Sequence, residues 1–534
     1  MEQMTGLDAS FLYFERPRMP MHVGGLYIYD QSSAPGGQVR FKDILNFIEE
    51  RVHLVRSFRQ RSVPVPLNLD HPYWINDPEF NIEYHVRHMA LPQPGDWRQL
   101  CILAARLFAR PLDLTKPLWE FNVIEGLDNV PGVPKGSYAL MTKVHHAAID
   151  GVSGMEMTAA VNSLHPDDPP PEGEKKWSPE AVPSAASLIA RAYGNNLRQP
   201  MKFADVVVRS VPALAQTAAG LGRGDFKRPA GGARVPRTRF NGTLSAHRVF
   251  EGRVFELDEV RDIKSRFQGA TINDAILSIV GGGMRKYLES KNELPDDTLI
   301  AMAPISVRTA GEKRDMGNQV SAMSVQLGTH VPDPLSRLEY THESARNSKE
   351  FTNAIGARQL ADYSKFIPAA LTGLAARLYT GLGLANSINP MFNCVVTNVP
   401  GPQVPLYSTG ARMVNQFGMG PIVDGMGLIH PVLSYCGKIT VSFTSDREMI
   451  PDPEFYADCI QESFDELKAA AVKKPHVKQP AKRKRAPAKK ATTAKRAAAK
   501  KATPRRRKPA ASANGAAVSP GASPSIQAAP RDDQ

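Results

Sequence analysis

The sequence predicts a mixed α/β protein of two halves, followed by a basic tail. Segments with strand-like and helix-like apolar periodicity alternate over residues 1–165 and again over residues 241–472. Residues 166–183, rich in Pro, Asp and Glu, resemble an exposed connector. We therefore expect four parts: an N-terminal lobe at 1–183, a helical and basic linker at 184–240, a C-terminal lobe at 241–472 and a tail at 473–534.

The first half alternates apolar strands with amphipathic helices. Residues 22–29 form a short apolar run, and a second strand-like run from Tyr138 leads directly to two histidines. Residues 41–58 and 97–108 each place their apolar side chains on one helical stripe. These runs predict strands that pack against helices.

The second half repeats this alternation. A helical, amphipathic stretch at 184–222 and a Gly/Pro/Arg loop at 223–241 precede it. Three glycines at 281–283 lie inside a predicted helix and lack the flanks of a nucleotide-binding loop, so they indicate close helix packing. The predicted strands are 249–256, 299–307, 320–327, 392–397 and 439–443, and the predicted helices are 273–290 and 455–471.

The net charge of +13 belongs to the tail and not to the main body. Residues 473–508 hold 17 Lys and Arg and no acidic residue, so the rest of the chain is mildly acidic. Bulky apolar residues are almost absent from residue 473 on. Such a segment cannot bury enough surface to offset its ordering entropy, and we expect it to be disordered.

The cysteines and the apolar segments point to an intracellular protein without a membrane span. Cys101, Cys394, Cys436 and Cys459 are far apart and match no CxxC metal spacing. The N-terminus does not read as a classical secretory signal. The most apolar stretch, 366–388, is broken by Arg377 and by glycines and a proline, so any membrane contact should be peripheral.

Residues 145–151, His-His-Ala-Ala-Ile-Asp-Gly, are the strongest functional signal. Histidine is the side chain best suited to take and return a proton near neutral pH. Neighbouring residues on a strand point to opposite faces, so only one of His145 and His146 can readily face a cleft. Gly151 lacks a Cβ and would permit a tight turn beneath the histidine.

The chain resembles the bacterial wax ester synthase/acyl-CoA:diacylglycerol acyltransferase family. HHxxxDG alone would also fit peptide-synthetase condensation domains, but further elements appear in the family's order over roughly residues 5–470. They are Leu7-Asp-Ala-Ser-Phe-Leu-Tyr13, Pro20-Met-His-Val-Gly24, Pro117-Leu-Trp119, Asn273-Asp274, Pro304-Ile-Ser-Val-Arg308, Gly317-Asn-Gln319, Asn398-Val-Pro-Gly-Pro402 and His430-Pro-Val-Leu-Ser-Tyr435.

The resemblance implies two chloramphenicol-acetyltransferase-like lobes with a substrate tunnel between them. It implies transfer of a long-chain acyl group from acyl-CoA to diacylglycerol, or to long-chain alcohols to give wax esters. His146 would be the general base, because the superfamily's minimal HxxxD spacing begins there. Since a thioester already has a good leaving group, we expect no cofactor, metal or covalent intermediate. The expected location is cytoplasmic, at the inner membrane or lipid droplets.

The other residues of the motif have competing interpretations. His145 should face away from the cleft and shape the loop, although His145, His146 and Asp150 could instead bind zinc. Asp150 could polarise the base or hold the loop through an ion pair. The resemblance favours the ion pair, with Arg308 as our candidate partner. Arg308 could equally be an ordinary surface arginine at a strand end.

Asn273, Asp274 and Trp119 are supporting candidates. Thr271 to Asp274 fits a helix capping box, which makes Asp274 a cap. The amide of Asn273 could instead donate to an oxyanion. Trp119 should anchor the loop beside the histidine strand as a core residue.

Two other functions fit parts of the chain. One is a condensation-type acyltransferase that depends on a carrier protein, although this chain shows no adenylation or carrier segment. The other is a non-catalytic tether between lipid droplets and DNA. The tail composition fits three roles equally well: binding DNA, binding anionic lipid, or improving solubility.

Overall fold

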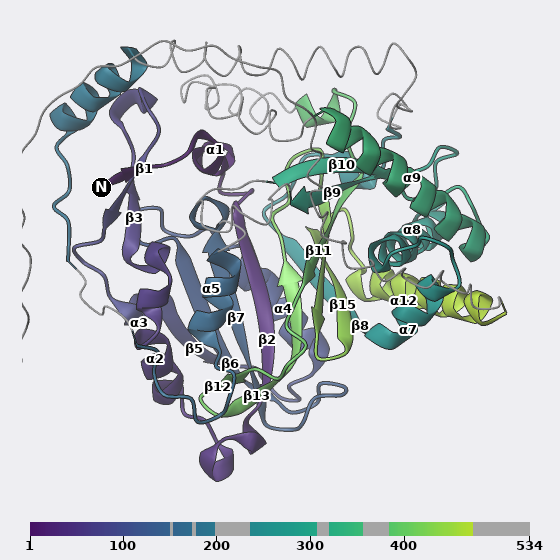
Figure 1. Cartoon of the computed structure of the whole chain (residues 1–534), viewed down its shortest axis with the longest axis horizontal. Helices are drawn as coiled ribbons and strands as arrows, with labels where there is room; N and C mark the ends of the chain where they lie inside the picture. Colours follow the sequence, from purple (N-terminus) through teal and green to yellow (C-terminus); the bar gives the residue numbers. More distant parts are fainter. Residues whose placement is uncertain (150–152, 173–177, 198–234, 307–319, 356–383, 474–534) are drawn as a thin grey trace, which may run out of the picture. The chain divides into compact units, whose positions relative to one another are not determined.

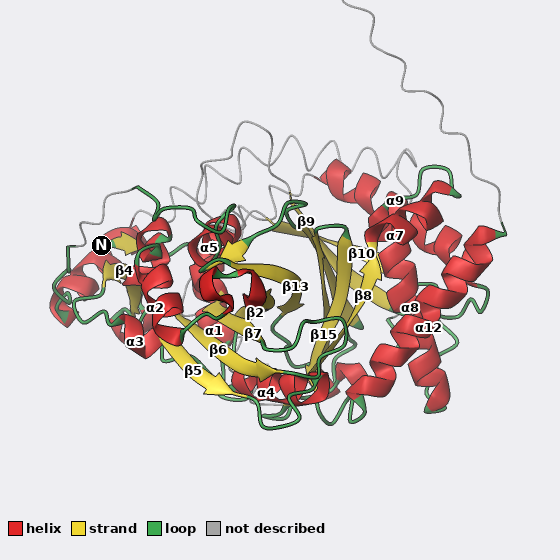
Figure 2. Cartoon of the chain, turned by 90° about the horizontal axis from the view of Figure 1, so that it is seen from below, coloured by secondary structure: helices red, strands yellow, loops and turns green. Residues whose placement is uncertain are grey.

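The strands of the described residues form two six-stranded sheets and one three-stranded sheet. The computed structural model describes residues 1–149, 153–172, 178–197, 235–306, 320–355 and 384–473. The first large sheet has the order β12-β13-β2-β7-β6-β5 and the second the order β10-β9-β11-β14-β15-β8 (Figures 1 and 2). Helices pack on both large sheets, which confirms the mixed α/β class.

The first sheet contains the strand that ends at the histidine pair. All nine residues of β7 are buried, and β7 pairs antiparallel with β2 so that His145 lies opposite His22. The bounds are β2 His22–Asp30, β5 Val86–Ala90, β6 Trp119–Leu127, β7 Ser137–His145, β12 Tyr407–Ser408 and β13 Ala411–Met419.

Side chains of β2 and β7 alternate between two hydrophobic clusters, as period-2 geometry requires. Leu26 and Met141 pack with α4 on one face, whereas Tyr27 and Leu140 pack on the opposite face, in the cluster that contains residues of α2 and α5. β7 is therefore covered on both faces. The bounds of these helices are α2 Phe41–Glu49, α4 Trp97–Ala109 and α5 Ser153–Val161.

The C-terminal end of α4 is attached to the sheet beside the histidines. The Lys143 ammonium donates to the carbonyl oxygens of Leu107 and Arg110, at 3.1 and 3.0 Å. The His22 ring hydrogen-bonds the Phe108 carbonyl oxygen at 2.6 Å. The last carbonyls of a helix lack partners within the helix and carry its negative dipole end, so a cation is stabilising there.

The second sheet carries a layer of packed helices on one face. The largest hydrophobic cluster joins these helices to the sheet (Figure 2). The strands are β8 Arg248–Glu256, β9 Ile300–Ser306, β10 Val320–Gln326, β11 Cys394–Pro400, β14 Leu428–Tyr435 and β15 Lys438–Asp446. The helices are α7 Leu257–Ser265, α8 Ile272–Ser290, α9 Pro334–Ile355 and α12 Pro453–Val472.

The small sheet contains the N-terminal strand and is covered by one helix. A helix over residues 185–197 packs on it through Leu188 and Ala192. The strands are β1 Glu2–Gln3, β3 Gln60–Val63 and β4 Tyr73–Asn76, and the neighbouring short helices are α1 Gly6–Phe14 and α3 Ile82–His85.

Two sequence predictions need correction. The predicted helix at 41–58 ends at Glu49, and 3₁₀ turns follow. Val52, Val55 and Phe58 are still buried, but β-branched valines favour extended backbone, and Val55 adopts it. In addition, β12 and β13 come from the range assigned to the C-terminal lobe but pair into the first sheet. The four domain boundaries stay a prediction.

Membrane-spanning segments were not expected, and in the described part of the chain no helix combines the length and apolar character that crossing a bilayer requires. Most of the apolar stretch at 366–388 lies outside the described residues.

The glycines at 281–283 permit the close helix packing that their pattern predicts. A Cβ on Gly283 would lie 2.7 Å from a side-chain carbon of Ile460 on α12, and one on Gly281 would collide with the carbonyl oxygen of Leu327. Because these neighbours belong to packed elements, α8 can approach them only without side chains at these positions.

We predict that Gly281→Ala lowers the free energy of unfolding by about 1–3 kcal/mol, because the new methyl group overpacks α8 against a backbone carbonyl. Urea unfolding of both proteins measures this. Gly194→Ala is the matched control: it also lies in a helix, but a Cβ there meets open space. Its stability should be unchanged or higher, and equal losses in both variants would contradict the packing explanation.

Candidate active site

The histidine pair occupies the turn directly after β7. His145 is the last residue of the strand, and a 3₁₀ turn covers His146–Ala148. The backbone N–H of His146 donates to the carbonyl oxygen of Met21 at 2.8 Å, which ties the turn to the start of β2. His145 is fully buried, whereas His146 keeps partial exposure. The two side chains therefore have different environments.

Both ring nitrogens of His145 are engaged. Nδ1 accepts the backbone N–H of Ala147 at 3.0 Å, so this nitrogen carries no proton. The proton of the neutral ring is then on Nε2, which donates to the Glu15 carboxylate at 2.8 Å. His145 thus links the turn to the C-terminal end of α1. With both nitrogens occupied, His145 is not available as a zinc ligand in this arrangement.

His146 is held in an apolar environment by α1. The ring of Phe11 stacks on the imidazole with centroids 3.9 Å apart and planes 14° from parallel. Phe11 also packs against the hydrophobic cluster of the second sheet. Burial lowers the pKa of His146 to about 4, and the neighbouring His145 acts in the same direction. The imidazole is therefore neutral at neutral pH.

α1 supplies contacts that the sequence did not assign. The segment 7–13 is one of the elements that carry the resemblance, but no role followed from it. Phe11 and Glu15 are four residues apart, so they lie on one side of the helix and reach both histidines. This i, i+4 pairing of an aromatic residue with a carboxylate is the only sequence signal, and many surface helices share it.

Asn273 and Asp274 lie at the start of α8. Thr271 and Asp274 form the predicted capping box, and the Asp274 carboxylate also accepts from the His342 ring at 2.9 Å. The side-chain amide of Asn398 donates to the Asn273 amide oxygen at 3.5 Å, which leaves the NH₂ group of Asn273 as a donor. Within the described residues no hydrogen bond joins Asn273 to the histidines.

Trp119 is a core residue, as expected. Its indole N–H donates to the Phe58 carbonyl oxygen at 2.9 Å, and its ring stacks on His85 with centroids 4.4 Å apart. Asp150, Gly151 and Arg308 lie outside the described residues. The described residues contain no group of three or more His, Cys, Asp or Glu that could hold a metal ion.

A largely apolar cavity of about 910 Å³ opens beside the motif. It brings together segments that are distant in sequence: Ile149 of the motif, Pro400 and Pro402 of the 398–402 element, and Leu433 of β14. The further lining residues are Tyr27, Arg51, Leu54, Thr158, Ala159, Asn162, Ser163, Leu164, Asp168, Pro169, Pro171, Val399, Gly401, Leu406 and Gln416. A cavity of this volume and character suits an alkyl chain.

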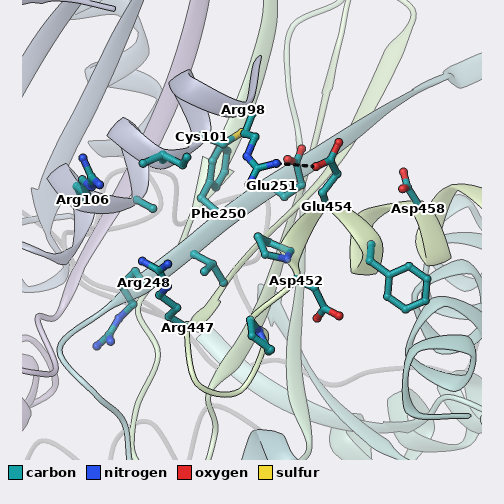
Figure 3. A pocket seen from close by; sticks show the side chains of 16 residues that line it. Arg98, Cys101, Arg106, Arg248, Phe250, Glu251, Arg447, Asp452, Glu454 and Asp458 are labelled. Atoms are coloured by element: carbon teal, nitrogen blue, oxygen red, sulfur yellow. Dashed lines mark ion pairs between the residues drawn. The ribbon is translucent and has the colours of Figure 1, made fainter. Parts of the chain in front are cut away.

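A second cavity, of about 550 Å³, differs in character. It lies between α4, β8 and the start of α12, and the sequence-predicted site residues are absent from its lining. Figure 3 shows arginines and carboxylates around it, with Arg98 on α4 reaching Glu454 on α12 at 3.7 Å. The ion pair joins elements of the two halves, and both side chains are exposed, so its contribution to stability is small.

Both halves of the chain are similar in sequence to acyltransferases. A sequence model described as the wax ester synthase/diacylglycerol acyltransferase catalytic domain matches residues 4–276, and one described as the WS/DGAT C-terminal domain matches 316–468. A Mycobacterium tuberculosis protein named as a diacylglycerol O-acyltransferase is 34% identical over 88% of this chain and 90% of its own. The O-acyltransferase WSD of Acinetobacter baylyi is 30% identical over 90% of this chain and 99% of its own.

Solved structures show the same fold. The wax ester synthase/diacylglycerol acyltransferase of Marinobacter aquaeolei superposes with a TM-score of 0.63 at 24% identity, over 88% of this chain and all of that one. The first condensation domain of the calcium-dependent antibiotic synthetase superposes with a TM-score of 0.52 at 14% identity, over 89% of this chain and 96% of that one. At these identities the likeness concerns the fold alone.

We predict that the protein loses stability as pH falls from about 6.5 toward 4, partly through His146. The pKa of His146 in the folded protein is below that of a histidine in the unfolded chain. Between these two pKa values the histidine is protonated in the unfolded chain and unprotonated in the folded protein. His146→Gln should therefore show a smaller loss of unfolding free energy between pH 7 and pH 4.5 in urea titrations. Parallel pH dependences in the two proteins would show that His146 titrates normally.

Proposed function

Because the chain belongs to the wax ester synthase/diacylglycerol acyltransferase family, we propose that it transfers a long-chain acyl group from acyl-CoA to diacylglycerol and makes triacylglycerol. The observation that carries this proposal is the match of both family domains to one chain, in which Ile149 of the histidine motif lines the apolar cavity. Long-chain fatty alcohols are a second class of acceptor, since they present the same hydroxyl on an alkyl chain.

In the proposed reaction His146 acts as the general base. An alcohol is a poor nucleophile at neutral pH, and a neutral imidazole can take its proton while the oxygen attacks the thioester carbonyl. The C–S bond then breaks, and the imidazolium returns the proton to the CoA thiolate. A low His146 pKa keeps the ring unprotonated before attack and makes the return of the proton favourable.

The remaining site residues would support this step. Glu15 would keep His145 in its observed tautomer and thereby hold the turn that carries His146. The NH₂ group of Asn273, whose amide oxygen accepts from Asn398, is our candidate donor to the oxyanion of the tetrahedral intermediate. The cavity beside Ile149 would hold an alkyl chain of one of the two substrates. The loop role of Asp150, with Arg308 as its partner, remains part of the proposal.

We predict that His146→Ala lowers turnover by about a hundredfold to ten-thousandfold while the protein stays folded, because the variant lacks the proposed base. Release of free CoA from palmitoyl-CoA, with dioleoylglycerol and hexadecanol as parallel acceptors, measures turnover and tests the function itself. His145→Ala is the comparison variant and should retain more activity. A His146→Ala protein with more than about a tenth of wild-type turnover would contradict the assignment. If the wild type released no CoA with either acceptor, the proposed function would be wrong.

We also propose that the protein works at the surface of a membrane or lipid droplet and that its basic tail contributes to binding there. Residues 473–534 lie outside the described residues, except for Lys473. Their 17 Lys and Arg within 473–508 would attract anionic lipid headgroups or DNA, each basic residue near a membrane contributing about 1 kcal/mol.

We predict that removing residues 473–534 leaves acyl transfer in detergent nearly unchanged and reduces binding to anionic vesicles or DNA. The binding that is lost should be the part that weakens steeply with salt, because it depends on counterion release. Sedimentation with vesicles and DNA gel shifts over a salt series measure it. A truncated protein without detergent activity would show instead that the tail belongs to the catalytic body.

A further inference from the structure

The helix over residues 185–197 has an apolar stripe on the side that faces away from the protein. Leu188 and Ala192 point into the core of the small sheet. Ile189, Tyr193 and Leu197 follow at intervals of four and are 41%, 70% and 62% exposed. An exposed stripe of this length at helical spacing is unusual, because surface helices normally turn polar residues to water.

The loop between β3 and β4 extends this stripe. Leu67 at its tip is 86% exposed, and Leu69 is also exposed. Leu67 and Asn68 both have left-handed backbone, with φ of 58° and 53°. Left-handed backbone is unfavourable for leucine. The loop therefore has a strained backbone at the same residue whose apolar side chain is exposed to solvent.

Hydrogen bonds hold the helix and the loop together. The Asn196 amide donates to the Leu69 carbonyl oxygen at 3.0 Å, and the Asn195 amide donates to the Asp70 carboxylate at 2.8 Å. The end of the helix and the tip of the loop are therefore neighbours, and their exposed apolar residues form one surface. We call Leu67, Leu69, Ile189, Tyr193 and Leu197 the apolar corner.

The charged side chains around the apolar corner include an exposed basic one, a buried carboxylate and a carboxylate in an ion pair. Residues 184–197 contain one charged side chain, the exposed Arg191, and no acidic residue. Asp70 is buried and accepts from Asn195. On the neighbouring strand β1, Glu2 is paired with Arg56 at 2.7 Å. Exposed apolar side chains beside a basic one can bind an anionic lipid surface, and here Arg191 is the basic side chain.

The apolar corner is also connected to the candidate active site. The Tyr13 hydroxyl on α1 hydrogen-bonds the His71 ring at 3.0 Å, directly after the loop that carries Leu67. Two residues before Tyr13 on the same helix, Phe11 stacks on His146. Figure 1 shows α1 directly after β1 of the small sheet. A membrane bound at the apolar corner would therefore contact a loop that is hydrogen-bonded to α1, the helix that stacks on His146.

From these observations we propose that the apolar corner is a docking surface for a lipid bilayer or droplet with anionic headgroups. Tyr193, Leu197 and Leu67 enter the interface, and Arg191 lies at headgroup level. This proposal rests on the proposed function, because it would bring the enzyme to the place where a water-insoluble acceptor resides. The new part of the proposal is the surface that contacts the membrane. This surface is separate from the basic tail.

The test compares the full chain with a variant that carries Leu67→Ser, Tyr193→Ser and Leu197→Ser. Sedimentation with phosphatidylcholine/phosphatidylglycerol vesicles in high salt suppresses the electrostatic contribution of the tail and leaves apolar insertion. The variant should bind at least about tenfold more weakly. The matched control carries Ile102→Ser, Val254→Ser and Phe455→Ser, three exposed apolar residues from α4, β8 and α12. It should bind like the wild type.

Three outcomes would overturn the proposal. They are unchanged vesicle binding by the corner variant, an equal loss in the control, and a wild-type dimer that the corner variant converts to a monomer. The last result would show that a second copy covers the corner. Acyl transfer to a short soluble alcohol without vesicles is measured in parallel. If the wild type transferred no acyl group to this alcohol, to hexadecanol or to dioleoylglycerol, the proposed function would be wrong, whereas the vesicle result would still decide the docking surface.

Discussion

The structure around the candidate site depends on the buried hydrogen bond between His145 and Glu15. β7 is covered on both faces and ends at a turn that would otherwise leave an imidazole N–H without an acceptor in the interior. The Glu15 carboxylate supplies that acceptor, and the backbone N–H of Ala147 fixes the tautomer. Since an unsatisfied buried donor costs about 1–3 kcal/mol, α1, β7 and the turn should hold their positions together.

The same burial that makes this hydrogen bond necessary sets the protonation state of His146. Phe11, which packs against the second sheet's core, stacks on the partly buried imidazole, and this burial disfavours the charged form. A neutral ring suits a reaction in which a hydroxyl must lose a proton and a thiolate must gain one. Within the described residues, the electrostatics of the site are therefore dominated by desolvation and not by a neighbouring carboxylate.

α1 lies between the proposed membrane-docking surface and the candidate active site and contacts residues of both. Phe11 on this helix and Glu15 at its C-terminal end contact the two histidines, while Tyr13 hydrogen-bonds His71 in the loop that also carries Leu67. Bilayer docking and proton transfer would thus involve the same nine-residue helix. The condensation-type alternative shares the fold, but the family matches over both halves favour an acyl-CoA-dependent O-acyltransferase.

The sequence by itself determined the fold class, the family, the histidine turn, the helix cap at Asp274 and the packing role of the glycines at 281–283. Each of these depends on local spacing or on a motif that one segment contains. The partners of the histidines, the pairing of β12 and β13 with the first sheet, the cavity beside Ile149 and the exposure of Tyr193 were decided only by the tertiary structure. They join residues separated by more than a hundred positions or depend on which face of a helix packs. Apolar periodicity alone identifies an apolar face but cannot say what covers it.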